Sequence, residues 1–222
     1  MPVANQLRES MKRSSWIREM FEEGARLKAI HGEDQVHDFS LGNPILEPPQ
    51  QVHRQLQEIL GNPTPGMHRY MPNAGFERTR AYVAEELNKE TGLNFKAQDT
   101  VMCVGAGGGL NVVMKALLDP GDEVLLPEPI YVCYRPLIEL CDGVVVSINT
   151  EETNFLVTAD SIERSITPKT KALVLCYPSN PTGQSIDFDE LKKIAAVAKK
   201  HNILIITDEI YADLQFEGFQ SI

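Results

Sequence analysis

The fold is decided by residues 172–211, which read ALVLCYPSNPTGQSIDFDELKKIAAVAKKHNILIITDEIY. Two strand-like runs, Ala172–Cys176 and Ile203–Thr207, enclose a helix-like run, Phe188–His201. A strand, a helix and a second strand in this order predict a parallel, helix-covered sheet. Because Ile203–Ile206 has no polar alternation, we expect the second strand to be buried on both faces.

The start of this helix is well defined by its flanking residues. Asp187 can accept a hydrogen bond from the first turn, and Glu190, three residues on, completes the pattern of a capping box. Ile186 and Leu191 are spaced for a hydrophobic staple across the same turn. We therefore expect the loop before Asp187 to be well fixed in place.

The alternation of strands and helices continues toward the N-terminus. The other predicted strands are Thr100–Val104, Glu123–Leu126 and Val144–Ile148, and the other helices between strands are Leu110–Leu118 and Tyr131–Leu140. Before the first of these strands, the sequence predicts helices over Ser14–Ile30, from Pro48-Pro49 to Leu60 and over Gly75–Leu87, with an extended segment at Val36–Leu41. The chain is therefore predicted to be an α/β protein with a mostly parallel sheet between helices.

Composition narrows the classes of partner and compartment. The 222 residues carry a net charge of −10, so we expect neither nucleic acid nor an anionic membrane as a partner. No apolar run is long enough to span a bilayer, and residues 1–18 lack the apolar core of a signal peptide. The four cysteines form no C-x-x-C pair or zinc pattern, which indicates buried free thiols. We expect a cytoplasmic protein without a bound metal.

A glycine-rich segment, Gly105–Gly109, stands between a predicted strand and a predicted helix. Small residues allow the backbone to approach a ligand, and the N-terminus of the helix offers free N–H groups to an anion. The segment lacks the third glycine of a dinucleotide fingerprint, since Leu110 stands there, and it lacks the Gly-Lys-Ser/Thr of a nucleotide P-loop. The alternative is a flexible turn without a ligand.

Two further polar segments follow strands. In Tyr177–Gly183, two prolines and a glycine fix the loop, so that Asn180 can donate to a ligand oxygen or else only shape the turn. An X-Pro bond in such a loop can be cis. Asp208 ends the most apolar strand, where a carboxylate needs a cationic partner, and Tyr211 shares its face if the chain turns helically. Alternatively, Asp208 caps a short helix.

Ligands of open α/β sheets bind beyond the carboxyl ends of the strands, which is where these features meet. An anion cradle, an amide donor and a buried carboxylate suit a phosphorylated pyridine that carries a ring oxygen. The carboxylate would keep the ring nitrogen protonated, which makes such a cofactor an electron sink. Tyr131, at the start of a predicted helix, is the candidate to stack on the ring.

From about Phe39 to Phe216, the chain resembles the class I/II aminotransferases, the fold-type I pyridoxal-phosphate (PLP) enzymes related to aspartate aminotransferase. The resemblance rests on Ser179–Gly183 and Asp208–Tyr211 at a family-like separation, and on Leu118–Glu123 after the glycines. It implies an incomplete PLP-binding large domain over residues 48–222. Residues 1–47 would then be an N-terminal arm and the first segment of the small domain.

The resemblance also implies a role for each matching position. Amides of Ala106 and Gly107, beside Gly105, would hold the cofactor phosphate, and Asp208 would pair with the pyridinium nitrogen. The other implied positions are Tyr131 for stacking, Asn180 and Tyr211 for the ring oxygen, Gly42 near the substrate carboxylate, and Tyr70 on the phosphate of the neighbouring subunit. A homodimer with shared active sites follows from the last of these.

The family's Schiff-base lysine and its carboxylate-binding arginine lie downstream of Asp208, and none of the lysines in this chain stands at that position. We therefore predict no catalytic residue of that kind here, and we expect the 222-residue chain alone not to transaminate. The expected activity of the parent enzyme is amino-group transfer between an L-amino acid and a 2-oxo acid. A PLP-dependent lyase of the same fold and a non-catalytic PLP-binding remnant are the alternatives.

Overall fold

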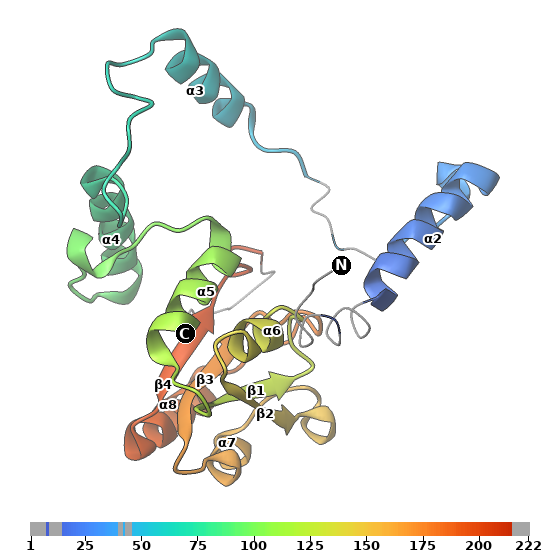
Figure 1. Cartoon of the computed structure of the whole chain (residues 1–222), viewed down its shortest axis with the longest axis vertical. Coiled ribbons are helices and arrows are strands. Elements are labelled where there is room, and N and C mark those ends of the chain that lie inside the picture. Colours follow the sequence, from blue (N-terminus) through green and yellow to red (C-terminus); the bar gives the residue numbers. More distant parts are fainter. Residues whose placement is uncertain (1–7, 9–14, 40–41, 43–45, 215–222) are drawn as a thin grey trace. The chain divides into compact units, whose positions relative to one another are not determined.

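The computed structural model describes residues 8, 15–39, 42 and 46–214 (Figure 1). The chain separates into two compact units, Met1–Arg69 and Tyr70–Ile222. Within the described ranges, no helix has both the length and the apolarity that crossing a bilayer requires.

Among its described residues, the first unit has two α-helices of more than one residue, both at the predicted places. Its elements are α2 (Ser15–His31), the 3-10 helix η1 (Glu33–Gln35) and α3 (Gln50–Gly61). Pro49 precedes α3 with a φ of −54°, the torsion that a proline brings to a helix start. The extended segment predicted at Val36–Leu41 is described only as far as residue 39, where it has no regular structure.

The second unit holds the sheet and most of the helices. Its elements are α4 (Glu77–Thr91), η2 (Ala97–Asp99), α5 (Gly105–Leu117), β1 (Glu123–Glu128), α6 (Tyr134–Glu139), β2 (Val144–Asn149), η3 (Glu151–Thr153), α7 (Ala159–Ser165), β3 (Thr170–Cys176), α8 (Phe188–His201) and β4 (Leu204–Asp208). The four strands lie in the order β2-β1-β3-β4, and every neighbouring pair is parallel. The predicted α/β class is therefore confirmed, and α8 has its predicted bounds.

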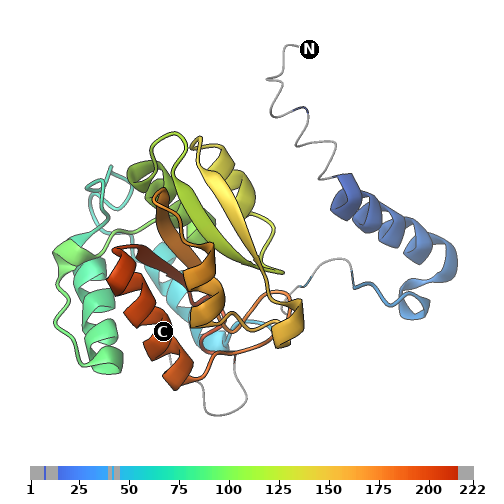
Figure 2. The same cartoon turned by 90° about the horizontal axis from the view of Figure 1, so that it is seen from below.

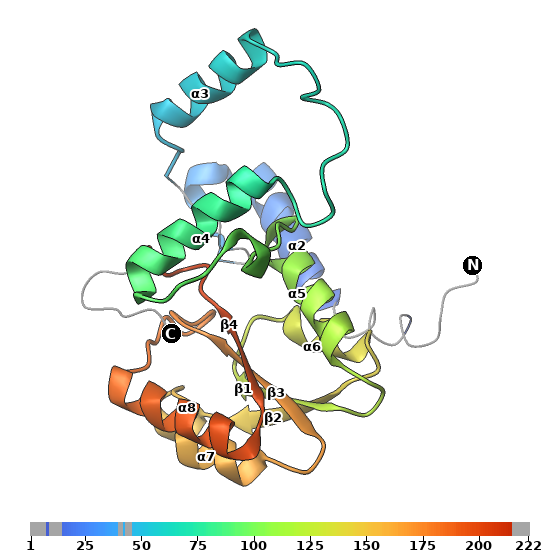
Figure 3. The same ribbon diagram turned by 90° about the vertical axis from the view of Figure 1, so that its left-hand side faces the viewer.

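Helices cover both faces of this sheet. Figures 1 and 3 show α5 and α6 over one face and α7 and α8 over the other, and the view from below brings α7 and α8 to the front (Figure 2). The strands alternate between the two sides. Val124 and Val174 belong to the core cluster of α5 and α6, whereas Leu125 and Leu173 belong to that of α7 and α8. Successive side chains of a strand point to opposite faces of the sheet. Because both faces are buried, neighbouring residues of one strand belong to different core clusters.

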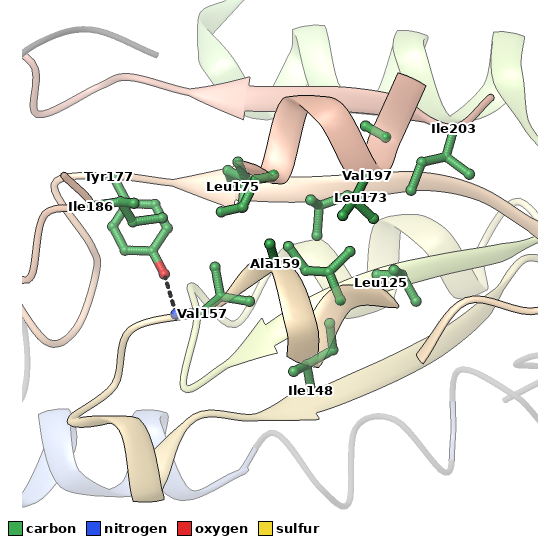
Figure 4. Packing of buried hydrophobic residues seen from close by; sticks show 13 residues of the cluster. Leu125, Ile148, Val157, Ala159, Leu173, Leu175, Tyr177, Ile186, Val197 and Ile203 are labelled. Carbon is green, nitrogen blue, oxygen red and sulfur yellow. Dashed lines mark hydrogen bonds between the residues drawn. The ribbon is translucent and has the colours of Figure 1, made fainter. Parts of the chain in front are cut away.

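Tyr177, one residue beyond β3, is a polar member of the core beneath α7 and α8. It is 4% exposed, and its hydroxyl accepts a hydrogen bond of 3.5 Å from the backbone N–H of Val157 (Figure 4). Ile186 and Leu175 belong to the same cluster. The end of β3 is thereby anchored on the side away from α5 and α6.

Strand β4 departs from the prediction of full burial. Ile205 packs against the core of α7 and α8 and Ile206 against that of α5 and α6, but Leu204 is 55% exposed. Among the described residues β4 pairs only with β3, so it is an edge strand of the sheet they form. An edge strand lacks a neighbour to shield its second side, which explains the exposure of Leu204.

The strand predicted at Thr100–Val104 was wrong. Its one backbone bond to a distant segment runs from the N–H of Met102 to the carbonyl of Ala74, at 2.9 Å, and Val104 is 96% exposed. A strand needs a neighbouring ladder, and within the described residues none lies beside this segment. The segment is instead an extended connection into α5.

The predicted capping box of α8 was half right. The Asp187 carboxylate accepts from the backbone N–H of Glu190 at 2.8 Å, as expected of a cap. The Glu190 carboxylate does not return to Asp187 but accepts from the N–H of Ala159, at 2.8 Å, in the first turn of α7. No helix was predicted from the sequence at α7, so the Ala159 N–H was not expected to compete for the Glu190 carboxylate.

The prediction of buried thiols holds for half of the cysteines. Cys141 and Cys176 are buried in the core beneath α5 and α6, whereas Cys103 is exposed and Cys133 is half-buried. Cys103 is exposed because it lies in the connection that forms no strand.

Candidate functional site

The carboxyl end of β4 and the start of α5 line an open hollow of 440 Å³. Ala106 and Gly109 line it from α5, and Asp208 and Glu209 line it from β4 and the turn that follows. Its volume falls in the range of about 300–1,000 Å³ that small-molecule sites have. The glycine segment and the carboxylate predicted from the sequence therefore face one common space.

The glycine segment forms the first turn of α5 rather than a loop before it. The helix was predicted from Leu110, but it begins at Gly105, whose φ is +68°. Gly105, Ala106 and Gly107 are exposed, while Met114, further along α5, is completely buried. The first-turn N–H groups of a helix have no intrahelical partner and lie at the positive end of its dipole. This turn is suited to bind an anion.

Asp208 is half-buried at the end of β4, and two donors hold its carboxylate. The hydroxyl of Tyr134 donates to Oδ2 at 2.8 Å, and the backbone N–H of Ile210 donates to Oδ1 at 3.1 Å. Residues 210–214 form a turn and not a helix. Within the described residues, Asp208 therefore caps no helix, and its carboxylate accepts instead from the N–H of Ile210 in this turn. Among the described residues no cation pairs with this carboxylate, which leaves it suited to a cationic ligand.

Asn180 and Tyr211 come together from the loops that follow β3 and β4. The amide Nδ2 of Asn180 donates to the hydroxyl of Tyr211 at 3.3 Å. The Tyr177-Pro178 and Asn180-Pro181 bonds are cis, as considered from the sequence, and Gly183 bonds back to Ser179 at 2.8 Å. The amide of one loop and the phenol of the other thus lie side by side at the carboxyl edge of the sheet.

Tyr131 lies in the connection before α6, because this helix begins three residues later than predicted. Its ring is 41% exposed and meets the ring of Tyr134 edge-on, with centroids 5.7 Å apart and planes at 83°. The Cys133 thiol beside it is the main cause that raises the pKa of Tyr131, with smaller contributions from burial, Tyr211 and Asp208. The ring contact places Tyr131 beside Tyr134, whose hydroxyl donates to Asp208.

Tyr134 is the site residue that sequence reasoning missed. It is completely buried, and burial is the main cause that raises its pKa, followed by Cys176 and Asp208. A signal was present in the sequence: Tyr134 follows Tyr131 by three residues, the spacing of neighbours on a helix face. Its hydroxyl partner, however, is 74 residues away in the chain.

The structure does not test two of the predicted positions. Tyr70 begins the second unit, and its side chain is fully exposed. Gly42 belongs to the first unit and is exposed, while Leu41, Asn43 and Pro44 lie outside the described residues. The roles of Gly42 and Tyr70 therefore stay predictions.

Comparison with protein families gives one match over most of the chain. The family described as aminotransferase class I and II matches residues 34–222. The aspartate/prephenate aminotransferase of Thermus thermophilus is 35% identical over 181 residues, which are 81% of this chain and 46% of that protein. The aspartate aminotransferase of Geobacillus stearothermophilus is 33% identical over 198 residues, 89% of this chain and 49% of that protein. The chain thus spans about half the length of these relatives.

Solved structures agree with the sequence comparison. An amino transferase from Eubacterium rectale has a TM-score of 0.90 at 29% identity, over 99% of this chain and 57% of that one. The aspartate aminotransferase of Thermus thermophilus with maleate has a TM-score of 0.84 at 31% identity, over 98% of this chain and 56% of that one. The fold therefore matches that of fold-type I enzymes, as expected from the sequence.

Proposed function

The chain belongs to the class I and II aminotransferase family, and we propose that the protein carrying it transfers an amino group between an L-amino acid and a 2-oxo acid, with PLP as cofactor. The observation that supports this most is the hollow that the first turn of α5 shares with Asp208. One end of that hollow suits a phosphate, and the other suits a protonated ring nitrogen. The aminotransferase names of the matching relatives favour transfer over the lyase alternative.

The residues at the site fit PLP group by group. A Cβ added at Gly105 or Gly107 meets no heavy atom within 4 Å beyond the helix's own backbone, so the first turn of α5 has room for a phosphate against its N–H groups. The Asp208 carboxylate suits a pyridinium. The Asn180 amide and the Tyr211 hydroxyl can each donate a hydrogen bond to a phenolate oxygen.

PLP supplies an electron sink for the negative charge that develops at the substrate α-carbon. In our proposal, the amides of Ala106 and Gly107, beside Gly105, anchor the phosphate, and Asp208 holds the proton on the ring nitrogen. Asn180 and Tyr211 donate to the ring oxygen, and Tyr131 covers one ring face and limits its contact with water. These residues bind and orient, so proton transfer at the substrate carbon must come from another group.

The substrate and subunit assignments extend this proposal to the whole protein. We place Gly42 near the substrate carboxylate, and Tyr70 on the phosphate in a neighbouring subunit of a homodimer. Residues 1–47 then form an arm and a small-domain segment, and residues 48–222 form part of the PLP-binding large domain. The full exposure of Tyr70 is compatible with a contact outside its own chain.

Replacing Asp208 by Asn in the full-length protein tests the proposal. Loss of the negative charge should remove the proton from the ring nitrogen and lower the rate of 2-oxo acid formation by about a hundredfold or more. The matched control is Asp213→Asn, an exposed carboxylate in the turn that follows β4, which should leave the rate unchanged. A wild-type protein that neither binds PLP nor forms a 2-oxo acid would refute the proposed function. An active Asp208→Asn variant would refute the role of Asp208.

A further inference from the structure

Tyr134 combines two properties that are seldom found in one side chain. It is completely buried in the core formed by α5, α6 and the sheet, yet its hydroxyl reaches the carboxylate of Asp208 at 2.8 Å. Burial raises the pKa of this hydroxyl well above its ordinary value, so it keeps its proton and donates. The ring is fixed by core packing, which makes the hydroxyl a donor with a set position.

The two donors to Asp208 differ in what they can fix. The N–H of Ile210 lies two residues along the chain and moves with the turn that follows β4. Tyr134 comes from the start of α6 and lies in the core that α5 and α6 form with the sheet. A carboxylate that is held at both oxygens has a defined plane as well as a defined position. Among the described residues, only Tyr134 ties that plane to the core.

The same residue also contacts Tyr131. The edge-on contact between the two rings, at 83°, sets the orientation of a tyrosine that is otherwise 41% exposed. Edge-to-face aromatic pairs have a preferred geometry, so a buried ring restricts its exposed neighbour. Tyr134 therefore touches two residues that the proposed function assigns to the cofactor ring, Asp208 at the nitrogen and Tyr131 at the face.

We propose that Tyr134 is a positioning residue, which holds the Asp208 carboxylate and the Tyr131 ring in the arrangement that a pyridinium cofactor requires. The inference rests on the proposed function. Tyr134 itself touches Asp208 and Tyr131 and acts through them. A purely structural hydroxyl, present only to complete the packing of α6, would not influence the ring nitrogen of a bound cofactor.

The test compares two buried tyrosines, each changed to phenylalanine in the full-length protein. Tyr134→Phe keeps the aromatic ring and removes the bond to Asp208. Tyr177→Phe removes a buried hydroxyl that bonds the Val157 N–H on the other side of the sheet. Each variant is loaded with PLP labelled at the ring nitrogen, and the nitrogen chemical shift is followed from neutral to alkaline pH. Urea unfolding of the cofactor-free proteins reports on the fold.

In the wild type and in Tyr177→Phe, the ring nitrogen should stay protonated across the range. In Tyr134→Phe, it should lose its proton at a lower pH, and kcat should fall about tenfold to a hundredfold, as expected for one lost hydrogen bond to a carboxylate, with a smaller change in KM. If Tyr134→Phe is folded and loaded with PLP, and its ring nitrogen titrates as in the wild type, the inference about Tyr134 is overturned while the proposed function stands. A wild type that does not bind PLP would overturn the proposed function and the inference together.

Discussion

At the residue scale, Gly105 determines how the backbone enters α5. Its φ of +68° lies in the left-handed region, where an L side chain costs about 1–2 kcal/mol. Gly107, in the same turn, has no such torsion, and a Cβ there would meet open space. Glycine is therefore required at the two positions for different reasons. Gly105 is required by its backbone torsion, and Gly107 leaves room at the proposed anion site.

We expect Gly105→Ala to lower the free energy of unfolding of the cofactor-free protein by about 1 kcal/mol, because the left-handed torsion is strained. Gly107→Ala should leave this free energy unchanged or raise it slightly, since alanine favours a helix. Urea unfolding followed by circular dichroism measures both. Equal stability of Gly105→Ala and the wild type would mean that the backbone relaxes without cost and that the torsion is not required.

At this scale, the sequence predicts the position of a residue when that residue lies at the end of a strand. Asp208 and Asn180 were predicted together because the carboxyl ends of parallel strands meet at one edge. Tyr134 was missed because its role depends on a partner 74 residues away and on the direction of its ring in the core. Composition and periodicity identify such a tyrosine only as a core residue.

At the scale of elements, Glu190 connects two helices. It lies in the first turn of α8, and its carboxylate accepts from the N–H of Ala159 at the start of α7. That backbone bond is the main cause that lowers the pKa of Glu190, followed by Lys193. Negative charge at a helix N-terminus is favourable, so one side chain stabilises the start of both helices.

We expect Glu190→Gln to destabilise the protein by about 1 kcal/mol at neutral pH, the usual loss for a helix cap. Because the folded pKa lies below the ordinary value of 4.5, this contribution is present above that pH and is lost as the pH falls through the folded pKa. The difference between variant and wild type should thus shrink in acid. Thermal unfolding at several pH values measures it.

The neighbouring carboxylate supplies the control. Asp189 is 86% exposed and pairs only with Lys192 at 3.3 Å among the described residues. Asp189→Asn should change stability little at any pH, because exposed ion pairs contribute little. A loss in Glu190→Gln that persists unchanged in acid would show that shape, and not charge, matters at this position.

The elements predicted best are those with long periodic patterns and local caps. Helix α8 has 14 residues and its own cap at Asp187, and its bounds were predicted without error. Helix α7 has only seven residues, too few for a periodic pattern, although Thr158 and Ser161 form a capping box there. The strand at Thr100–Val104 was wrong because an apolar run does not reveal whether a neighbouring ladder exists.

At the scale of the whole molecule, the buried tyrosines limit stability in alkali. Burial raises the pKa of Tyr177 to about 12, against an ordinary value of 10.0. Between these values the unfolded chain loses the proton and the folded chain keeps it, so stability falls as the pH rises through this window. The full effect of Tyr177 is about 2–3 kcal/mol. The pKa of Tyr134 is also raised, which adds to the loss.

We expect Tyr177→Phe to lose less stability than the wild type between about pH 10 and pH 12, because phenylalanine has no proton to release. At neutral pH the variant should differ little, since the bond it removes is long, at 3.5 Å. Urea unfolding at a series of pH values gives both quantities. Parallel curves for the two proteins would mean that Tyr177 titrates in the folded state as it does in the unfolded chain.

The proposed homodimer predicts that lesions at Tyr70 and Asp208 complement each other. In a hybrid dimer of a Tyr70→Ala subunit and an Asp208→Asn subunit, shared sites place both substitutions in one active site and leave the other intact. A hybrid purified through two different tags should then regain about half of the wild-type activity per dimer, since one of two symmetric sites is whole. If Tyr70 served its own subunit, each site would carry one lesion and the hybrid would be no more active than the single variants. Because Tyr70 is fully exposed, its substitution should leave the unfolding curve of the protein unchanged, so a recovery can be assigned to the shared site and not to folding.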